Sequence, residues 1–370
     1  MVGGQGMALK ILLVKLSSLG DVVHALPVLH DIHAALPGTR IDWVVEKSFA
    51  PLLAPLANTS HGLDRVIPCE IRRWRKSFWT AATRAEWRRF KAQLQLENYD
   101  AVIDLQGLAK SALVARLAQL TPGGKRFALA NQTEGSGYEA PTRWVADVAI
   151  YIEPHIHAVQ RSRELCAKAL GYEMQGPPDF GLQAVVQAAE PAESSGLTHL
   201  APGRPVVAFV HGTSRADKTW PLAQWVELGQ KLNAAGFQVG LPHGSDAEQA
   251  TSEAIAAALN AGDAAGHATG VHQASVWPRL SLDTLTPALA GCAGVIGVDS
   301  GPSHIAVALD LPHVQIYNFD TAWRTGPLAW PGEGRLVLQR SVFDQPTPGV
   351  DAVWRAWLAC LAAAVQRSED

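Results

Sequence analysis

The sequence is poor in cysteine and lacks the long apolar runs of membrane-spanning proteins. Its four cysteines lie far apart and form no Cys-x-x-Cys pair; they are Cys69, Cys166, Cys292 and Cys360. Such spacing favours reduced thiols over a disulfide framework or a zinc site. No uncharged run reaches the ~18 residues that a membrane-spanning helix needs, and the first residues lack the features of a signal peptide. We therefore expect an intracellular protein.

Several short motifs of nucleotide and metal chemistry are also absent. No D-x-D occurs, which disfavours a metal-bridged nucleotide-sugar site, and there is neither a G-x(4)-G-K-[ST] phosphate loop nor an HExxH zinc motif. One G-x-G-x-x-A is present at residues 135–140. It follows polar residues rather than a strand, and Pro141 interrupts the helix that should come next. We therefore reject it as a dinucleotide-binding fingerprint.

Charge gives little information about partners. Charged residues make up 18% of the 370 residues and hydrophobic residues 48%, with a net charge of −3. This composition is globular, and the length is too great for one ordinary core, so we expect two domains. Any anionic ligand must be met by a local patch. The near-neutral total and the lack of a recognisable RNA or DNA module argue against nucleic acid.

Apolar strands alternate with helical patterns in two separate blocks. Strands are predicted at 9–14, 41–45, 101–103, 206–210, 237–241 and 294–298, with helices at 22–35 and 223–235. This alternation implies parallel pairing, so the predicted fold class is α/β with two Rossmann-like, doubly wound domains. The Ala-, Ser-, Gly- and Pro-rich segment 187–204 is typical of a linker. The cleft between two such domains is the expected ligand site.

The predicted domains are 1–190 and 191–345, followed by a C-terminal segment at 346–370. That segment contains an amphipathic helix at 350–366. We expect this helix to pack back on the N-terminal domain.

The first candidate site is Lys15-Leu-Ser-Ser-Leu-Gly-Asp-Val-Val-His24, which follows the first predicted strand. Gly20 would allow a tight turn and a close approach of backbone to ligand. Asp21 would then stand at the carboxyl edge of the sheet, where a carboxylate can take a proton from an attacking hydroxyl. Asp21 is equally suited to capping the following helix, and both roles stay open. Asp104, at another strand end, is the only comparable carboxylate nearby.

The second candidate site is Gly297-Val-Asp-Ser-Gly-Pro-Ser-His304, between a predicted strand and an apolar helix. The backbone amides of Ser300, Gly301 and Ser303, together with the helix dipole, would bind a diphosphate without a metal. The alternative is an ordinary Asp/Ser cap with His304 as a polar surface residue.

The third candidate site is His211-Gly-Thr-Ser-Arg-Ala-Asp-Lys-Thr-Trp-Pro221. Thr213 and Ser214 offer hydroxyls, and Lys218 offers a compact positive charge for a leaving phosphate. A lone lysine in a loop is usually solvated. One framed by hydroxyls at the end of a strand is a better candidate.

The fourth feature is a basic and aromatic stretch from Arg72 to Lys91. Arginines and lysines interleaved with Trp and Phe could bind nucleic acid, an anionic membrane surface or a phosphorylated lipid. The alternative is a helix with a solvated basic face and its aromatics in the core.

Together these motifs resemble the lipopolysaccharide heptosyltransferases of glycosyltransferase family 9, and within them the heptosyltransferase I group. The resemblance runs from Met7 to the C-terminal helix and rests on segments 15–27, 99–108, 212–221 and 298–304. It implies a GT-B fold, with the acceptor in the N-terminal half and the nucleotide in the C-terminal half. It implies an inverting transfer of L-glycero-D-manno-heptose from ADP-heptose to Kdo of Kdo2-lipid A. It also implies no metal cofactor and a place at the cytoplasmic face of the inner membrane.

Carried over motif by motif, the resemblance makes Asp21 the general base and Lys218 a second catalytic residue. It assigns donor binding to residues of the C-terminal half, with Glu248 at the ribose hydroxyls, Leu280 under the adenine and Asp299 near the heptose: Thr213, Ser214, Lys218, Glu248, Leu280, Asp299, Ser300, Gly301 and His304. Acceptor binding is predicted at Ser18 and in the basic stretch at Arg72, Arg73 and Arg75.

Two departures from the family pattern concern the nucleotide. His243 stands where the family usually has Trp, while Ser214 and Ser300 replace commoner Thr residues and keep the hydroxyl. Other functions stay open: transfer to a different acceptor, a nucleotide-sugar-binding or epimerase-like GT-B protein, or a non-enzymatic membrane adaptor. The adaptor leaves the three cleft loops unexplained. Oligomeric state and domain closure are not indicated by the sequence.

Overall fold

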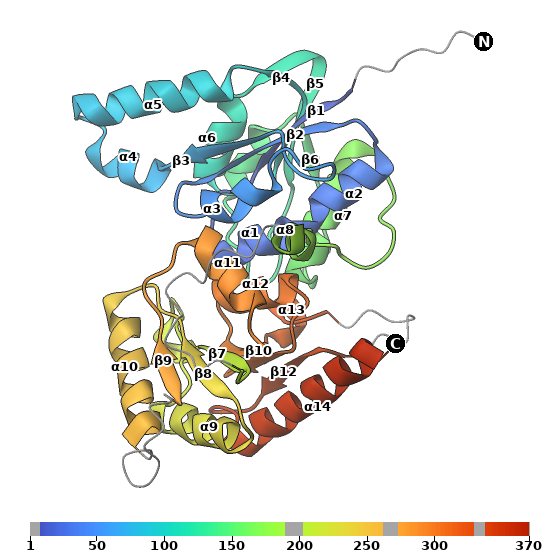
Figure 1. Cartoon of the computed structure of the whole chain (residues 1–370). Coiled ribbons are helices and arrows are strands. Elements are labelled where there is room, and N and C mark those ends of the chain that lie inside the picture. Colours follow the sequence, from blue (N-terminus) through green and yellow to red (C-terminus); the bar gives the residue numbers. More distant parts are fainter. Residues whose placement is uncertain (1–7, 189–202, 262–272, 329–336, 370) are drawn as a thin grey trace. The chain divides into compact units, whose positions relative to one another are not determined.

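The computed structural model describes residues 8–188, 203–261, 273–328 and 337–369 (Figure 1). The chain divides into two compact units, Met1–Gly181 and Leu182–Asp370, and each is described by itself. The boundary predicted at residue 190 and most of the predicted linker lie in 189–202, outside the described residues.

The first unit is built on a sheet of six parallel strands in the order β3-β2-β1-β4-β5-β6. The strands are β1 (Lys10–Val14), β2 (Arg40–Glu46), β3 (Arg65–Cys69), β4 (Asn98–Asp104), β5 (Gln119–Leu129) and β6 (Val148–Ile150). Every residue of β1 is buried, as a strand covered by helices on both faces requires. The register pairs Val14 with Val44 and Asp104, so these three strands end at one edge.

Helices cover this sheet, and two of them replace the single helix predicted at 22–35. The helical segments are α1 (Leu19–Ala25), α2 (Pro27–Ala35), α3 (Ala50–Leu53), η1 (Ala54–Leu56), α4 (Ile71–Ser77), α5 (Ala81–Leu94), α6 (Ala109–Leu117), η2 (Ala140–Trp144) and α7 (Ala158–Leu170). The break falls at Pro27, which has no amide hydrogen to continue the helical ladder. The tight turn expected at Gly20 is also wrong, because Gly20 is helical and the loop is residues 15–18.

The second unit repeats the same strand order. Its six parallel strands run β12-β11-β10-β7-β8-β9. They are β7 (Val206–Val210), β8 (Gln238–Leu241), β9 (Ala274–Val276), β10 (Gly294–Val298), β11 (His313–Tyr317) and β12 (Gln339–Phe343). Counted within each unit, both sheets have the order 3-2-1-4-5-6 of a Rossmann fold. The predicted fold class of two doubly wound domains is therefore confirmed.

The C-terminal helix belongs to the second unit. The helical segments of this unit are α8 (Leu182–Ala188), η3 (Ala216–Lys218), α9 (Leu222–Ala234), α10 (Asp246–Asn260), α11 (Leu282–Ala290), α12 (Gly301–Ala308), α13 (Ala322–Thr325) and α14 (Val350–Glu369). α14 packs on β11, β12 and α9 (Figure 1). Its Val353, Trp357 and Cys360 are fully buried in the core of this unit. The buried face of the helix therefore lies within its own unit, and the expectation that the helix also packs back on the N-terminal domain stays a prediction.

The strand order fixes where ligands can approach each unit. In a doubly wound sheet the loops after the first and fourth strands leave in opposite directions, and a crevice opens at the carboxyl ends of those strands. These are β1 and β4 in the first unit, and β7 and β10 in the second. Three of the four candidate sites follow these strands directly.

A buried histidine in β11 makes the stability of the second unit dependent on pH. His313 is fully buried and its Nδ1 lies 2.9 Å from the Val295 carbonyl oxygen. Burial lowers the pKa of His313 to about 4. Because the unfolded chain takes up this proton at a higher pH than the folded chain does, stability is full above pH ~6.5 and falls as the pH drops towards 4.

We expect the substitution His313→Asn to flatten this pH dependence. The asparagine amide can donate to Val295 in place of Nδ1 but does not titrate. Between pH 7 and pH 5 the free energy of unfolding of the wild type should fall by about 2 kcal/mol more than that of the variant. Urea unfolding at both pH values measures the difference. Parallel pH curves for the two proteins would contradict the assignment.

Candidate active site

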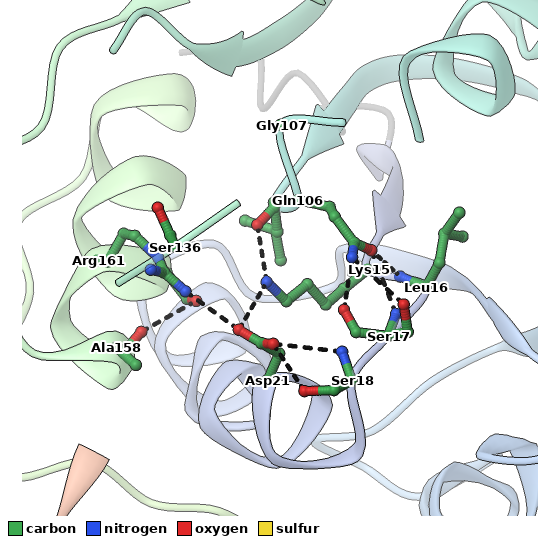
Figure 2. Close-up of polar contacts among 12 residues, drawn as sticks. Lys15, Leu16, Ser17, Ser18, Asp21, Gln106, Gly107, Ser136, Ala158 and Arg161 are labelled. Atoms are coloured by element: carbon green, nitrogen blue, oxygen red, sulfur yellow. Dashed lines mark hydrogen bonds and ion pairs between the residues drawn. The ribbon is translucent and has the colours of Figure 1, made fainter. Parts of the chain in front are cut away.

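Asp21 caps the first helix with one of its carboxylate oxygens. Its Oδ2 accepts hydrogen bonds from the Ser18 amide at 3.2 Å and from the Ser18 hydroxyl at 2.9 Å (Figure 2). Asp21 is the third residue of α1, the position from which an acidic side chain reaches back to the cap residue. The capping role that the sequence left open is therefore present.

The other carboxylate oxygen of Asp21 faces two cations. Oδ1 lies 3.4 Å from Lys15 Nζ and 3.3 Å from Arg161 Nη2, which α7 supplies (Figure 2). The side chains of Lys15 and Arg161 are only 3% and 6% exposed, whereas that of Asp21 is 36% exposed. Burial would raise the pKa of Asp21, but the two cations and the Ser18 hydroxyl hold it well below its usual range. Asp21 is thus an ionised carboxylate that remains open to solvent.

A glutamine side chain fixes the loop that leads to Asp21. Gln106 Oε1 accepts from the amides of Leu16 and Ser17 at 2.8 and 3.2 Å, and its Nε2 donates to the Ser17 carbonyl at 2.6 Å. Lys110 Nζ, from the first turn of α6, donates to Ser17 Oγ at 2.6 Å. The loops after β1 and β4 are therefore joined at the crevice of the first sheet.

Asp104, the alternative base, has a structural role. Its Oδ1 accepts from the amides of Gln106 and Gly107 at 2.9 and 3.2 Å, and its Oδ2 accepts from Ser111 Oγ at 2.9 Å. The residue is 1% exposed, and burial raises its pKa to about 6. With its oxygens bonded inside the protein, this carboxyl holds the β4 loop and does not present itself to a substrate.

The second unit places a lysine against a buried carboxylate. Lys218, in η3 after β7, has its Nζ 2.5 Å from Asp299 Oδ2 at the end of β10. His304 Nε2, from α12, lies 3.4 Å from Asp299 Oδ1, and Gln315 Nε2 lies 3.5 Å from His304 Nδ1. His304 is only 5% exposed, so the alternative that it is a polar surface residue is wrong.

Asp299 is ionised in spite of its burial. Desolvation would raise its pKa, but His304 and Lys218 together hold it well below its usual range. Thr213 Oγ1 reaches the Asp299 carbonyl oxygen at 3.5 Å and links the loops after β7 and β10. The Lys218 side chain keeps 20% exposure. Lys218 is therefore paired with Asp299 while its side chain remains partly accessible to solvent.

The first turn of α12 follows Asp299 directly. Ser300 is the cap residue and Pro302 lies in the first turn, as is common at helix starts. Ser300 Oγ is buried and has no hydrogen-bond partner among the described residues, so this side chain does not cap the helix. The first-turn amides, beginning with Gly301, have no acceptor within the helix and with the helix dipole can bind an anion.

The remaining donor candidates lie at the same edge of the second sheet. Glu248 is in the first turn of α10, and its Oε2 accepts from the Gly244 amide at 2.6 Å. It packs so closely on Gly212 that a Cβ there would lie 2.5 Å from Glu248 Cδ. Leu280 is half-buried between β9 and α11, and Ser214 is exposed after β7. The loops after β7 to β10 thus bring the predicted donor residues to one edge.

The aromatic residues of the basic stretch divide into an inner and an outer group. α4 and α5 form a hairpin in which Trp74, Trp87 and Phe90 pack together, with ring centroids 5.4 to 5.8 Å apart. For these three residues, the alternative interpretation, in which the aromatic side chains of the stretch pack in the core, is correct. Phe78 and Trp79, in the turn between the helices, are 45% and 86% exposed.

The three arginines predicted to bind the acceptor divide as well. Arg73 pairs with Glu70 at 2.8 Å and with Glu86, and so ties α4 to α5. Arg72 and Arg75 are exposed on α4. Arg73 is therefore placed as a structural residue of the hairpin, and Arg72 and Arg75 are the two that present their charge to solvent.

Within the described part of the chain, no group of three or more His, Cys, Asp or Glu side chains is placed to hold a metal ion. None of the helices described is both long enough and apolar enough to cross a membrane.

The sequence matches the family model of glycosyltransferase family 9 (heptosyltransferase) over residues 87–334. It is 39% identical to lipopolysaccharide heptosyltransferase 1 of Pseudomonas aeruginosa over 316 residues, which cover 84% of this chain and 78% of that protein. It is also 39% identical to the enzyme of the same name from Escherichia coli K12 over 311 residues, 84% of this chain and 88% of that one. The chain belongs to glycosyltransferase family 9, the heptosyltransferases. Its identity to lipopolysaccharide heptosyltransferase 2 of E. coli is 26% over 332 residues.

Solved heptosyltransferases have the same fold. E. coli heptosyltransferase WaaC with ADP superposes with a TM-score of 0.75 at 34% identity, covering 94% of this chain and 98% of that one. The same enzyme with ADP-2-deoxy-2-fluoro heptose gives a TM-score of 0.70 at 33% identity, covering 98% and 99%. The two Rossmann-like units of this chain therefore have the fold of solved heptosyltransferases, as the sequence motifs implied.

Proposed function

We propose that this heptosyltransferase moves L-glycero-D-manno-heptose from ADP-heptose to Kdo of Kdo2-lipid A. The transfer would invert the anomeric centre, need no divalent cation and take place at the cytoplasmic face of the inner membrane. The choice of acceptor rests on the difference in identity, which is 39% to the heptosyltransferases 1 of P. aeruginosa and E. coli and 26% to the heptosyltransferase 2 of E. coli. The solved relatives with ADP and with a fluorinated ADP-heptose support the donor.

Asp21 is the base in this proposal. The acceptor hydroxyl attacks the anomeric carbon, the bond from that carbon to the diphosphate oxygen breaks, and the hydroxyl proton passes to the Asp21 carboxylate. The depressed pKa keeps Asp21 ionised at neutral pH, and its exposed surface lets a hydroxyl approach. Because Oδ2 is held by Ser18 and Oδ1 by two cations, the carboxylate is fixed before the acceptor arrives.

The departing ADP is stabilised by groups of the second unit. Charge builds on the diphosphate as the bond breaks, and preorganised donors aimed at such charge lower the barrier most. The Lys218 ammonium and the first-turn amides of α12 are such donors. Asp299 and Thr213 hold the loop positions, and Glu248 would accept from the ribose hydroxyls. These cationic and amide groups take the place of the metal that a D-x-D enzyme uses.

The transfer itself can be tested with purified components. We expect ADP release from ADP-heptose that depends on Kdo2-lipid A, with a product carrying one added heptose, and unchanged activity in excess EDTA. Coupled ADP detection and mass spectrometry of the lipid measure both. Transfer only to an acceptor that already carries heptose would make this a second-heptose enzyme. A strict requirement for Mg²⁺ would overturn the metal-free mechanism.

We expect Asp21→Asn to lower kcat by at least ~100-fold, because positioned bases contribute roughly 10²–10⁴-fold. The amide keeps an acceptor for the Ser18 cap but removes the negative charge beside Lys15 and Arg161, so the melting temperature should also fall. Turnover is therefore measured well below that temperature, with donor binding followed by calorimetry. Donor affinity should be unchanged, since the substitution lies in the other unit.

Asp104→Asn is the matched comparison for Asp21→Asn. It alters a carboxyl that is fully bonded inside the protein, so it should cost stability while turnover per folded molecule stays within a few-fold of wild type. The opposite result, normal turnover for the Asp21 variant and loss for the Asp104 variant, would reassign the base.

Lys218→Ala should lower kcat by about 10²-fold, because the ammonium acts mainly on the departing diphosphate. The single variant also leaves Asp299 unpaired, and its carboxylate would then repel the donor. The double variant Lys218→Ala/Asp299→Asn should restore donor affinity but not kcat. Lys231→Ala is the matched control. It removes a cation from α9 whose partner, Asp351, is 82% exposed, and it should change neither donor affinity nor kcat. A normal kcat for Lys218→Ala would remove Lys218 from the mechanism.

A further inference from the structure

The turn between α4 and α5 presents two large aromatic side chains to solvent. Trp79 is 86% exposed and Phe78 is 45% exposed. The turn lies at the end of the hairpin that is away from the strands of the first sheet (Figure 1). Two adjacent aromatic side chains that stay exposed keep a large apolar area in contact with water, although burial of that area would be favourable. The proposed chemistry uses neither residue.

The turn is held in place rather than loose. Inside the hairpin, Trp74 packs on Trp87 and Phe90, and its Nε1 donates to Glu86 at 2.8 Å. At the turn, Thr80 Oγ1 accepts from the Thr83 amide at 3.2 Å and donates to the Ser77 carbonyl at 3.1 Å. A capped turn on a packed hairpin holds Phe78 and Trp79 outward, so their exposure is built into the local structure.

The charge around these aromatics is strongly positive. Residues 70–91 contain eight Lys and Arg and two Glu, a net charge of +6, while the whole chain carries −3, which leaves −9 for the remainder. The two glutamates, Glu70 and Glu86, are paired with Arg73. Most of the other basic side chains are exposed, among them Arg75, Lys76, Arg84 and Arg88. An anionic surface is therefore the partner that this hairpin fits.

We propose that the α4–α5 turn is a membrane anchor, in which Phe78 and Trp79 enter the headgroup region of an anionic phospholipid bilayer and the surrounding cations bind lipid phosphates. Tryptophan favours this depth because its ring is amphipathic, and such binding combines buried apolar area with attraction to anionic lipid. The inference rests on the proposed function, whose acceptor is embedded in a bilayer. It goes beyond that function because the anchor binds phospholipid without any acceptor present.

Flotation with vesicles of phosphatidylglycerol and phosphatidylethanolamine that contain no acceptor tests the anchor directly. The full chain should float with these vesicles, remain unbound with phosphatidylcholine vesicles and be released by high salt. The double variant Phe78→Ala/Trp79→Ala should bind at least about tenfold more weakly. Equal binding of wild type and variant, or equal binding to neutral vesicles, would overturn the inference.

Trp144→Ala is the matched control. Trp144 is 73% exposed in the same unit and lies beside Arg143, whose guanidinium carbon is 5.8 Å from its ring centroid, but it is outside the hairpin. This variant should float like wild type, and an equal loss of binding would show that any exposed tryptophan matters. If single-stranded oligonucleotides bind the chain at the salt concentration where vesicles do not, the surface is for nucleic acid and the proposal is wrong.

Activity on a deacylated, water-soluble form of the acceptor separates this inference from the proposed function. Phe78→Ala/Trp79→Ala should transfer heptose to that acceptor at the wild-type rate, because the anchor acts only at a bilayer. If the double variant transfers heptose at the wild-type rate and also floats like wild type, the anchor is ruled out and the proposed transferase function stands. If flotation depends on the two aromatic residues but the wild type transfers no heptose, the proposed function is wrong and the anchor stands.

Discussion

Parallel pairing of β1 with β4, and of β7 with β10, is the constraint on which both sites depend. Each pair lies where the strand order of its sheet reverses, so the loops that follow leave in opposite directions and expose the carboxyl ends of the strands. Residues far apart in sequence then meet there. Gln106 holds the loop that precedes Asp21, and Asp299 holds Lys218. The same strand order, used twice, positions the ionised Asp21 carboxylate in one unit and the side chain of Lys218 in the other.

Charge is distributed in opposite ways at the two crevices. In the first unit a partly exposed carboxylate is paired with two buried cations, Lys15 and Arg161. In the second a buried carboxylate, Asp299, holds a partly exposed cation, Lys218. In each case the buried charge is paired with an oppositely charged side chain that is itself partly exposed. This arrangement makes Asp21 available to a hydroxyl and Lys218 available to a phosphate while limiting the cost of unpaired buried charge.

Local sequence signals predicted six of the twelve strands described (β1, β2, β4, β7, β8 and β10), the fold class, and the loops that carry Asp21, Lys218 and Asp299, because each of these is encoded within a dozen residues. Interactions across long sequence separations were not predicted. Arg161 lies 140 positions from Asp21, and nothing in its own helix marks it as a partner of that carboxylate. The role of Asp104 and the pairing of Arg73 with Glu86 likewise depend on tertiary contacts. Packing also decided the place of α14, whose apolar face gave no sign of which unit it would cover.

A carboxylate whose pKa is held low by two cations is a weak proton acceptor, which at first argues against Asp21 as a base. The same cations act on the substrate, however. A hydroxyl bound beside Lys15 and Arg161 would have its own pKa lowered, since nearby positive charge favours the alkoxide as much as the carboxylate. The pKa difference between donor and acceptor of the proton, rather than either pKa alone, sets the driving force for its transfer. In the proposed mechanism, the cations that weaken the base would therefore also stabilise the charge that develops on the attacking oxygen, so the low pKa of Asp21 is compatible with a role as base.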